Sequence, residues 1–407
     1  MRLLCHLPDR GSLGQDWRAY PKDIFRMTPA PIHRNLHVLE LGTQLGVGGI
    51  TRHILALRVW LQDHGHRVTL AGAPDVWVNA GNDPDYLALP INRVVGGGGT
   101  LPKRLFSAFV AARKLRRWLK SNPVDILHAH DSAPALVANL ARRGLNIPLI
   151  VTYHGSEPER IAGFGRIARG CDLVVTPSHK SAEDLERIGK VPRDKLKVIG
   201  LGVNPPPPVT PEQVATLRQE LLGDGDRLIM TIVRLSYQKG VDILIDCVTR
   251  LMKTHPGWRF IVAGDGPDEA KLHALASAAG VLPALRFIGR TSQPHLHLRA
   301  ADLFLLTSRW EALPFTIVEA FQAGCPSVAT ACSGVVELID ASVGRVAPVG
   351  DVPAICAAVE QVLATEPHRK AMAAAALARA SEDRFDPDWV HPQFEKLYLS
   401  LCRPRLS

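Results

Sequence analysis

Short apolar runs alternate with longer amphipathic stretches along most of the chain. The first repeat has an apolar run at 36–41, a helical pattern at 50–64 in which Ile54 and Leu57 share a face, and a second apolar run within 65–72. A strand, a crossover helix and a second strand form a βαβ unit. The pattern therefore predicts parallel strands.

The same alternation continues in two blocks separated by four consecutive prolines at 205–208. The first block adds predicted strands at 124–130, 148–153, 172–176 and 197–199, and helices at 102–120, 133–142 and from Ser178. The second block has predicted strands at 228–233, 259–263, 285–288, 301–307, 328–330 and 345–347, and helices at 240–255, 269–280 and 352–364. A run of prolines forms a stiff, extended linker, so the blocks are expected to be separate domains.

We therefore predict an α/β protein with two doubly wound parallel-sheet domains, whose strand ends face a central cleft. The predicted division is an N-terminal extension at 1–35, a first domain at 36–204, a second domain at 205–385 and a C-terminal helix at 386–407. That helix is expected to pack back toward the first domain. A length of 407 residues agrees, because single cores stop growing at shorter lengths.

Composition places the chain among soluble globular proteins, with 46% hydrophobic and 21% charged residues. We expect no membrane-spanning segment, because no apolar run is long enough. The first residues turn polar too early for a signal peptide. Seven cysteines are scattered without a paired spacing, which favours a reducing, cytoplasmic location.

A net charge of +9 points to an anionic partner, and nucleic acid is disfavoured because no nucleic-acid-binding motif accompanies the charge. The predicted helix at 102–120 combines apolar residues such as Leu105, Phe106 and Phe109 with a strongly basic face. An ordinary solvated face is the favoured interpretation. The alternative is peripheral contact with an anionic membrane at the inner face of the plasma membrane, which would present a lipid-linked acceptor.

The chemistry is concentrated in the stretch 308–324, where Glu311 and Glu319 are separated by seven residues. Pro314 marks a predicted helix start and Gly324 its end, so Glu311 belongs to a loop and Glu319 to the second helical turn. A strand, a tight loop and a helix start together form an anion site. Carboxylates on both sides of such a site indicate a ligand that also carries hydroxyls, and a nucleotide sugar has both groups.

Several motifs resemble those of the retaining glycosyltransferase family 4, the glycosyl transferases group 1, over roughly residues 36–400. They are the E-x7-E pair Glu311 and Glu319, Arg234 with Lys239 and Gly240, the stretches 264–267 and 333–337, and, in the first half, Gly48 and Gly49, Gly65 and His66, His128 and His130, and His154 and Gly155. The order and spacing of these motifs are jointly specific. The resemblance implies a GT-B fold, in which two Rossmann-like domains face a cleft.

The resemblance also implies roles for individual residues. Glu319 would bind the ribose hydroxyls of the donor and Glu311 would face the donor sugar. Arg234 and Lys239 would bind the phosphates, the first with two parallel hydrogen bonds and the second as a point charge. The alternatives are solvated surface cations for Arg234 and Lys239, a helix-surface carboxylate for Glu319, and a charge that complements the helix dipole for Glu311. The other expected donor-binding residues are Gly48, Gly49, Gly264, Leu313, Pro314, Phe315 and Thr316.

Histidines are expected on the acceptor side. By resemblance, His154 lies near the reacting centre and orients a hydroxyl, although a core histidine satisfied by the backbone is an alternative. We interpret His128 and His130 as structural. No metal is expected, because His295 and His297 do not share a helix face and no Asp-x-Asp motif ends a strand.

The predicted function is a retaining, metal-independent glycosyltransferase that needs no cofactor. It would move a sugar from a nucleotide-diphosphate sugar, with UDP as the expected nucleotide, to a sugar or lipid-linked acceptor hydroxyl. The expected setting is envelope, exopolysaccharide or lipopolysaccharide biosynthesis. Two alternatives are a sugar-nucleotide epimerase of GT-B fold and a non-catalytic GT-B subunit of a polysaccharide assembly complex.

Overall fold

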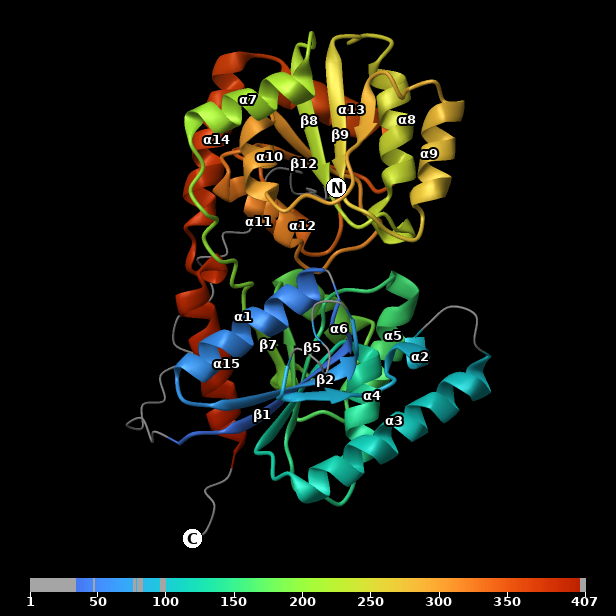
Figure 1. Ribbon diagram of the computed structural model, residues 1–407, viewed down its shortest axis with the longest axis vertical. Coiled ribbons are helices and arrows are strands. Elements are labelled where there is room, and N and C mark those ends of the chain that lie inside the picture. The colour runs from blue at the N-terminus through green and yellow to red at the C-terminus, as the bar shows by residue number, and fades with distance from the viewer. Residues whose placement is uncertain (1–33, 47, 76–77, 79–82, 96–99, 403–407) are drawn as a thin grey trace, which may run out of the picture. The chain divides into compact units, whose positions relative to one another are not determined.

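The computed structural model describes residues 34–402 except 47, 76–77, 79–82 and 96–99. The predicted N-terminal extension at 1–35 therefore lies outside the described residues, apart from its last two positions. From Asn35 onward the chain forms one compact unit that contains two parallel sheets (Figure 1).

The first sheet has seven strands in the order β3-β2-β1-β4-β5-β6-β7, and every pairing is parallel. The strands are β1 (His37–Gln44), β2 (Arg67–Ala73), β3 (Tyr86–Ala88), β4 (Ile126–His130), β5 (Leu149–Thr152), β6 (Leu173–Thr176) and β7 (Leu196–Val198). The helices around them are α1 (Gly49–Asp63), α2 (Asn92–Val95), α3 (Leu101–Ser121), α4 (Ser132–Ala141), α5 (Pro158–Ala168) and α6 (His179–Arg187).

Alternation along the strands of the first sheet produces two separate apolar cores. On one face, residues such as Leu39 and Leu127 pack with α3, α4 and α5. On the other face, residues such as Val38 and Ile126 pack with α1 and with α15 (Pro387–Leu401), the last helix of the chain. Glu40 is therefore assigned by its register to the face that α1 and α15 cover.

The second sheet has six strands in the order β10-β9-β8-β11-β12-β13, again all parallel. They are β8 (Arg227–Ile232), β9 (Trp258–Ala263), β10 (Leu285–Phe287), β11 (Leu303–Leu306), β12 (Ser327–Thr330) and β13 (Gly344–Ala347). The helices are α7 (Pro211–Leu222), α8 (Val241–Leu251), α9 (Glu269–Ala278), α10 (Pro294–Ala300), α11 (Phe315–Gln322), α12 (Val335–Leu338), α13 (Val352–Leu363) and α14 (Glu366–Ala380). Two parallel-sheet α/β domains confirm the predicted fold class.

The linker between the sheets is held by the segment that precedes α15. The Leu201 amide donates to the Arg384 carbonyl at 2.8 Å, and the Val203 amide donates to the Phe385 carbonyl at 2.9 Å. Gly200 is needed here because a Cβ would lie 2.0 Å from the Arg384 oxygen. Beyond this point α15 contributes Val390, Phe394, Leu397 and Tyr398 to the core under the first sheet.

The pattern of apolar residues does not predict α5, α7 or α14. The first contains two glycines, Gly163 and Gly165, and α7 buries only Leu221 fully. The third is alanine-rich and buries only Met372 and Ala376. A helix without a broad apolar stripe leaves little periodic signal in the sequence.

The helix α3 corrects one expectation. Leu105, Phe106 and Phe109 do not face the core; their exposed fractions are 56%, 68% and 57%. The buried face of α3 uses smaller residues, Ala108, Ala111 and Ala112, together with Leu115 and Leu119. Within the described residues, no helix is both long and apolar enough to cross a membrane.

Candidate functional site

The loop between β11 and α11 carries the two predicted carboxylates. Glu311 lies in the loop and is buried, and Glu319 lies in the second turn of α11. The helix begins at Phe315, with Pro314 as its N-cap, and Gly324 follows its end with a φ of +66°. The loop, the helix and the terminating glycine were predicted, and only the place of Pro314 shifts by one position.

The predicted phosphate-binding lysine is paired with one of these carboxylates. Lys239 Nζ lies 2.5 Å from Glu311 Oε1, which also accepts a hydrogen bond from Ser308 Oγ at 2.7 Å. Gly240 allows this approach, because a Cβ at that position would lie 2.1 Å from the Thr307 carbonyl oxygen. In this structure Lys239 therefore neutralises Glu311, and a phosphate would have to share the ammonium group.

Arg234 follows β8 and is exposed. It makes no hydrogen bond or ion pair with any described residue. Its loop is braced by the turn after β9, where the Leu235 amide donates to the Asp265 carbonyl at 2.8 Å. Gly264 has a φ of +141°, and a Cβ there would lie 1.8 Å from the Val233 oxygen. The backbone of Arg234 is thus fixed while its guanidinium group stays open to a ligand.

Glu319 meets an unpredicted partner from the first half of the chain. Arg52 Nη1, in the first turn of α1, lies 2.6 Å from Glu319 Oε1. Burial raises the pKa of Glu319, and the charge and hydrogen bond of Arg52 offset only part of that increase. No other hydrogen bond from a described residue reaches this carboxylate. Glu319 can therefore accept further donors such as ligand hydroxyls.

The two predicted glycines before α1 differ in their surroundings. A Cβ on Gly49 would lie 2.9 Å from the Phe315 ring, whereas Gly48 has no described neighbour within 4 Å of such an atom. The remaining predicted donor-loop residues divide by burial: Leu313 and Pro314 are buried, and Phe315 and Thr316 are half-buried. The side chain of Leu313 belongs to the core, so its contact with a ligand would come from its backbone.

His154 lies beside the donor loop because the next residue is glycine. Gly155 has a φ of +95°, and a Cβ there would lie 2.8 Å from the Ala312 amide nitrogen. The His154 amide donates to Asp131 Oδ1 at 3.0 Å. Sequence reasoning missed Asp131. A signal for its importance is visible only in the backbone, where it has a φ of +73° without being glycine. Burial raises the pKa of Asp131 to about 7, although the hydrogen bond from His154 lowers it.

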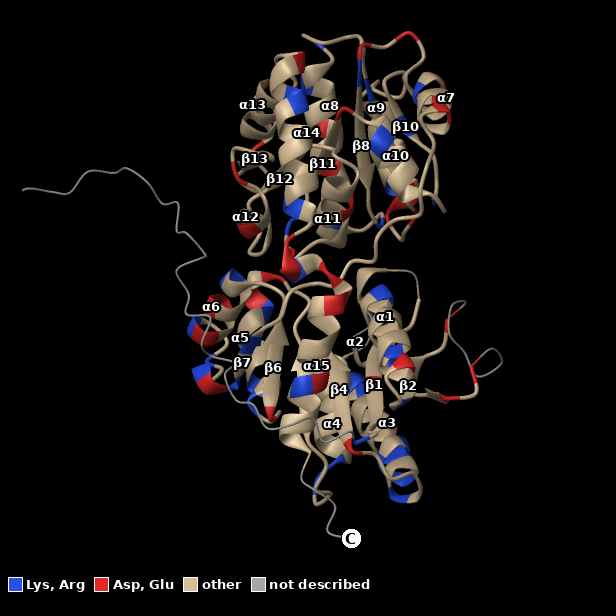
Figure 2. Ribbon diagram, turned by 90° about the vertical axis from the view of Figure 1, so that its left-hand side faces the viewer, with Lys and Arg blue, Asp and Glu red and all other residues tan. Residues whose placement is uncertain are grey.

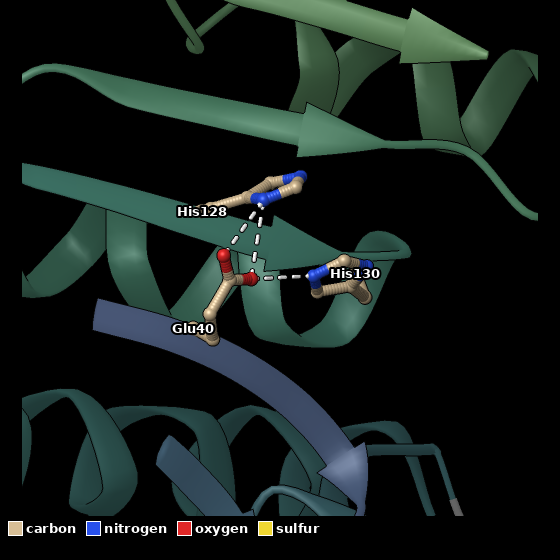
Figure 3. A group of neighbouring side chains, drawn as sticks. All are labelled: Glu40, His128 and His130. Carbon is tan, nitrogen blue, oxygen red and sulfur yellow. Dashed lines mark hydrogen bonds and ion pairs between the residues drawn. The ribbon is translucent and has the colours of Figure 1, made fainter. Parts of the chain in front are cut away.

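His154 adjoins a buried polar network. Figure 3 shows three of its members, Glu40, His128 and His130. His130 Nδ1 is 3.0 Å from His154 Nε2, and His130 Nε2 is 2.7 Å from Glu40 Oε2. The other Glu40 oxygen lies 3.2 Å from His128 Nδ1 and 3.1 Å from the Tyr398 hydroxyl. His130 contacts His154 directly, so it is more than the structural histidine we predicted. Glu40 was missed, although a lone carboxylate in the apolar run of β1 is a usable signal.

Glu40, His128 and His130 offer ligand atoms within 4.8 Å of one another, an arrangement that can hold a metal ion. Those atoms are engaged with one another here: Glu40 accepts from His130, and His128 Nδ1 also lies 2.7 Å from the Tyr398 hydroxyl. Glu40, His128 and His130 therefore satisfy each other by hydrogen bonding. Outside this cluster, His297 Nδ1 lies 2.9 Å from the Gln293 carbonyl oxygen.

The fold consists of two doubly wound domains. The second domain has an acidic loop and a basic pair at its strand ends, and the first domain has a histidine at a strand end. This arrangement is that of the GT-B class of glycosyltransferase. The model of the family described as Glycosyltransferase Family 4 matches residues 47–205, and that described as Glycosyl transferases group 1 matches residues 214–379. Together they cover most of the chain. The protein belongs to glycosyltransferase family 4 and is a glycosyltransferase.

Similar proteins agree with this assignment. The phosphatidyl-myo-inositol mannosyltransferase of Mycolicibacterium smegmatis is 25% identical, over 86% of this chain and 90% of its own. The lipopolysaccharide core biosynthesis mannosyltransferase LpsB of Rhizobium meliloti is 32% identical over 37% of this chain and 45% of its own. Anabaena HepE, solved in complex with UDP-glucose, superposes with a TM-score of 0.74 at 21% identity over 90% of this chain and 100% of its own.

Proposed function

We propose that this glycosyltransferase moves a sugar from a nucleoside-diphosphate sugar to an acceptor hydroxyl with retention of configuration, and without a metal ion or other cofactor. The observation that carries the proposal is the convergence of Arg52, Glu319, Glu311 and Lys239 with the His154 turn. Gly155 packs on the backbone of the donor loop, so the proposed donor and acceptor sides are neighbours.

In the proposed reaction, the bond between the anomeric carbon and the diphosphate oxygen breaks, and the acceptor oxygen bonds to the same carbon from the same face. The acceptor proton passes to the departing diphosphate. Arg234 and Lys239 stabilise the negative charge that develops on the diphosphate. Glu311 is held by Lys239 and Ser308, which suits a role in positioning the sugar better than a role as a free nucleophile.

UDP is the favoured nucleotide, and the fold similarity to HepE, solved with UDP and with UDP-glucose, supports that choice. A thermal-shift screen against UDP, GDP and ADP tests it, because a ligand at a hundred times its dissociation constant stabilises a protein by about 2.7 kcal/mol. UDP is expected to give the largest shift. No shift with any of the three would remove the donor proposal.

Turnover must then be measured with the matching nucleotide sugar, with and without an acceptor and in the presence of a chelator. We expect an α-configured product from an α-configured donor, unaffected by chelation. Product of inverted configuration would exclude the retaining mechanism. A change in the donor sugar without any acceptor would instead indicate an epimerase. Failure to release nucleotide with every acceptor tested would favour the non-catalytic alternative.

The acceptor is proposed to be a sugar or lipid-linked hydroxyl used in envelope or surface polysaccharide biosynthesis, in the cytoplasm at the inner face of the plasma membrane. Relatives named for phosphatidyl-myo-inositol and lipopolysaccharide core support this setting. The structure adds the exposed apolar residues of α3. Figure 2 shows lysine and arginine positions along the same helix. The exposed apolar and basic residues of α3 are Leu101, Leu105, Phe106, Phe109, Val110, Lys103, Arg113, Lys114, Arg117 and Lys120.

Exposed apolar residues followed by exposed cations on one helix fit the interface of an anionic membrane. Arg116 is excluded from this surface, because its Nη1 donates to the Ala141 carbonyl at 2.8 Å. Replacing Arg113, Lys114 and Arg117 by Gln, or Phe106 and Phe109 by Ser, should reduce co-sedimentation with vesicles containing anionic lipid.

A matched control removes three exposed cations from the second domain, Lys253, Lys271 and Arg299. It has the same net charge as the triple variant of α3 and should bind vesicles as the unmodified protein does. Equal losses in both triple variants would mean that net charge alone, rather than α3, sets membrane contact.

A further inference from the structure

We propose that Glu40 and His130 are positioning residues that hold the His154 ring in its Nε2–H tautomer and leave Nδ1 as a hydrogen-bond acceptor for a substrate hydroxyl. The proposal rests on the proposed function for the identity of that substrate. The geometry of the relay itself, from Glu40 through His130 to His154, is independent of the reaction.

The direction of each hydrogen bond in the relay follows from its buried end. An ionised carboxylate can only accept hydrogen bonds, so His130 Nε2, 2.7 Å from Glu40 Oε2, must carry a proton. A neutral imidazole with a proton on Nε2 has a lone pair on Nδ1. His154 Nε2, 3.0 Å from that lone pair, must therefore donate. The remaining nitrogen of a neutral His154 ring is an acceptor.

The charge states agree with this assignment. Burial raises the pKa of Glu40, but the charge and hydrogen bonds of His128 and His130 outweigh burial and hold that pKa well below its usual range. Burial lowers the pKa of His130 to about 3, against the opposing effect of Glu40. Burial, with His130 and His128 nearby, also holds the pKa of His154 well below its ordinary value. At neutral pH the relay is one carboxylate followed by two neutral rings.

The opposite tautomer is disfavoured by the buried carboxylate. If His154 Nε2 were the acceptor, His130 would need its proton on Nδ1 and would turn a lone pair toward Glu40. Glu40 and His130 are 0% and 1% exposed, so water does not replace the lost donor. The opposite tautomer would therefore replace a charge-assisted hydrogen bond by a lone pair facing a carboxylate oxygen. Tyr398, on the other carboxylate oxygen, and His128, whose Nδ1 lies 3.1 and 3.2 Å from the two oxygens, keep Glu40 in place.

The accessible end of the relay is His154. Its side chain is half-buried, and Nδ1 makes no hydrogen bond with a described residue and is not among the buried polar atoms without a partner. Solvent, and hence a ligand, reaches this nitrogen. A neutral acceptor nitrogen recognises a hydroxyl and gives no attraction to a phosphate. The relay thus selects a sugar hydroxyl, of either donor or acceptor, as the group that His154 contacts.

The tautomer can be measured directly by ¹⁵N NMR of the histidine rings in the full chain, with the His154→Gln variant used to assign the signals. We expect His154 to be neutral at pH 7, with its proton on Nε2. A proton on Nδ1, or a charged ring, overturns the proposal. Because this measurement requires no substrate, it stands or falls independently of whether sugar transfer is found.

Two variants of His130 separate the ends of the relay. The amide of Gln reaches the position of Nε2 and that of Asn the position of Nδ1, so His130→Gln keeps the donor to Glu40 and His130→Asn keeps the acceptor for His154. We expect His130→Gln to lower kcat about tenfold with little change in donor KM, by analogy with the lower end of the loss when the partner that orients a metal-bound histidine is removed. Compared with His130→Gln, the His130→Asn variant should be less stable, and its kcat should fall by a smaller factor.

His37→Gln is the matched control. His37 is buried and lies on β1, the strand that carries Glu40, but its ring contacts the Pro123 carbonyl and the Thr69 hydroxyl and no member of the relay among the described residues. Its kcat per folded molecule should fall less than about threefold, on the scale of that tenfold loss.

Equal losses of kcat in His130→Gln and His37→Gln overturn a positioning role. One zinc ion per chain that is lost in Glu40→Gln also overturns it, because a metal on these groups would replace the protons of the relay.

Discussion

In the second domain the candidate site consists of charged side chains that, apart from Glu311, are at least partly exposed. In the first domain it consists of a carboxylate and neutral rings that, apart from His154, are buried. Lys239 and Glu311 pair across two strand ends, Glu319 pairs with Arg52, and Arg234 has no such partner within the described structure. The relay from Glu40 to His154 is closed by hydrogen bonds at every buried step. The donor side must therefore exchange partners when a ligand binds, while the histidine side is organised beforehand.

The comparison implies that the donor side contributes to rate and the histidine side to both rate and stability. This difference reflects solvation. Exposed ion pairs add about 0–1 kcal/mol to stability and can be broken at little expense. Buried polar networks leave unsatisfied groups when one member is removed, and the effect on stability is larger.

The largest expected effect comes from removing charge on the donor side. Arg234→Ala or Glu319→Ala should lower kcat/KM by about 10²–10³, by analogy with the loss of one group that stabilises the transition state. The melting temperature should hardly change, because Arg234 has no partner among the described residues and the Arg52–Glu319 pair is partly exposed. Steady-state kinetics and thermal unfolding on the same samples check both statements.

Arg290→Ala is the control for that experiment, since Arg290 is exposed nearby and pairs with Asp265 at 2.6 Å. It should retain nearly full activity. Near-normal turnover in Arg234→Ala and Glu319→Ala would mean that the exposed charges of the second domain are not the donor site.

The next effect concerns stability in the first domain. Both ring nitrogens of His53 are buried and have no hydrogen-bond partner among the described residues, and burial holds the pKa of His53 well below its ordinary value. His53→Leu should therefore raise the free energy of unfolding by about 1–3 kcal/mol at pH 7, because it removes an unsatisfied buried group. Denaturant unfolding measures this change.

The increase in the free energy of unfolding that His53→Leu produces should be larger at acidic pH. Below about pH 6.5 the unfolded chain protonates His53 while the folded ring stays neutral, so acid favours the unfolded state. By pH 5 this linkage adds up to about 2 kcal/mol to the advantage of the Leu variant. A gain that stays constant from pH 7 to pH 5 would show that His53 is protonated equally in both states.

A smaller effect tests where the diphosphate approaches. Gly48 has a φ of 160°, which any residue can adopt, and a Cβ at this position would meet no described atom within 4 Å. The Gly48→Ala variant should therefore have an unchanged melting temperature. If the ligand contacts this backbone, the added methyl group should weaken donor binding about tenfold, or about 1.4 kcal/mol. Gly49→Ala, which meets the Phe315 ring, should instead reduce stability. Unchanged donor affinity in Gly48→Ala would place the diphosphate elsewhere.

The smallest expected effect is that of Arg52→Ala. The Arg52 side chain is 44% exposed, so its loss should change stability by less than about 1 kcal/mol. Without ligand, Arg52 forms an ion pair with Glu319, and a nucleotide that uses Glu319 must break this pair. The Arg52→Ala variant should therefore bind the nucleotide up to about fivefold more tightly, which calorimetry can measure. Weaker binding would indicate that Arg52 contacts the nucleotide and is not merely a competitor for Glu319.

Much of the fold could be predicted because helices and strands with one apolar face leave a periodic signal. The donor loop was also predictable, since Glu311, Pro314, Glu319 and Gly324 lie in one short stretch whose order sets its geometry. The helices α7 and α14 were not, because few of their residues are buried, and α5 was not, because its two glycines weaken the helical signal. The exposed position of Phe106 could not be predicted either, since periodicity reveals an apolar face but not whether anything covers it.

By itself the sequence determined the alternation of strands and helices, the two domains and the residues of the E-x7-E loop, because each depends on neighbours in the chain. Only the tertiary structure decided the pairing of Arg52 with Glu319, and of Tyr398 with Glu40, whose positions differ by 267 and 358 residues. Local patterns carry no record of such distant partners. The first pair forms where the start of α1 meets α11. The second forms because α15 returns to cover the face of the first sheet on which Glu40, His128 and His130 lie.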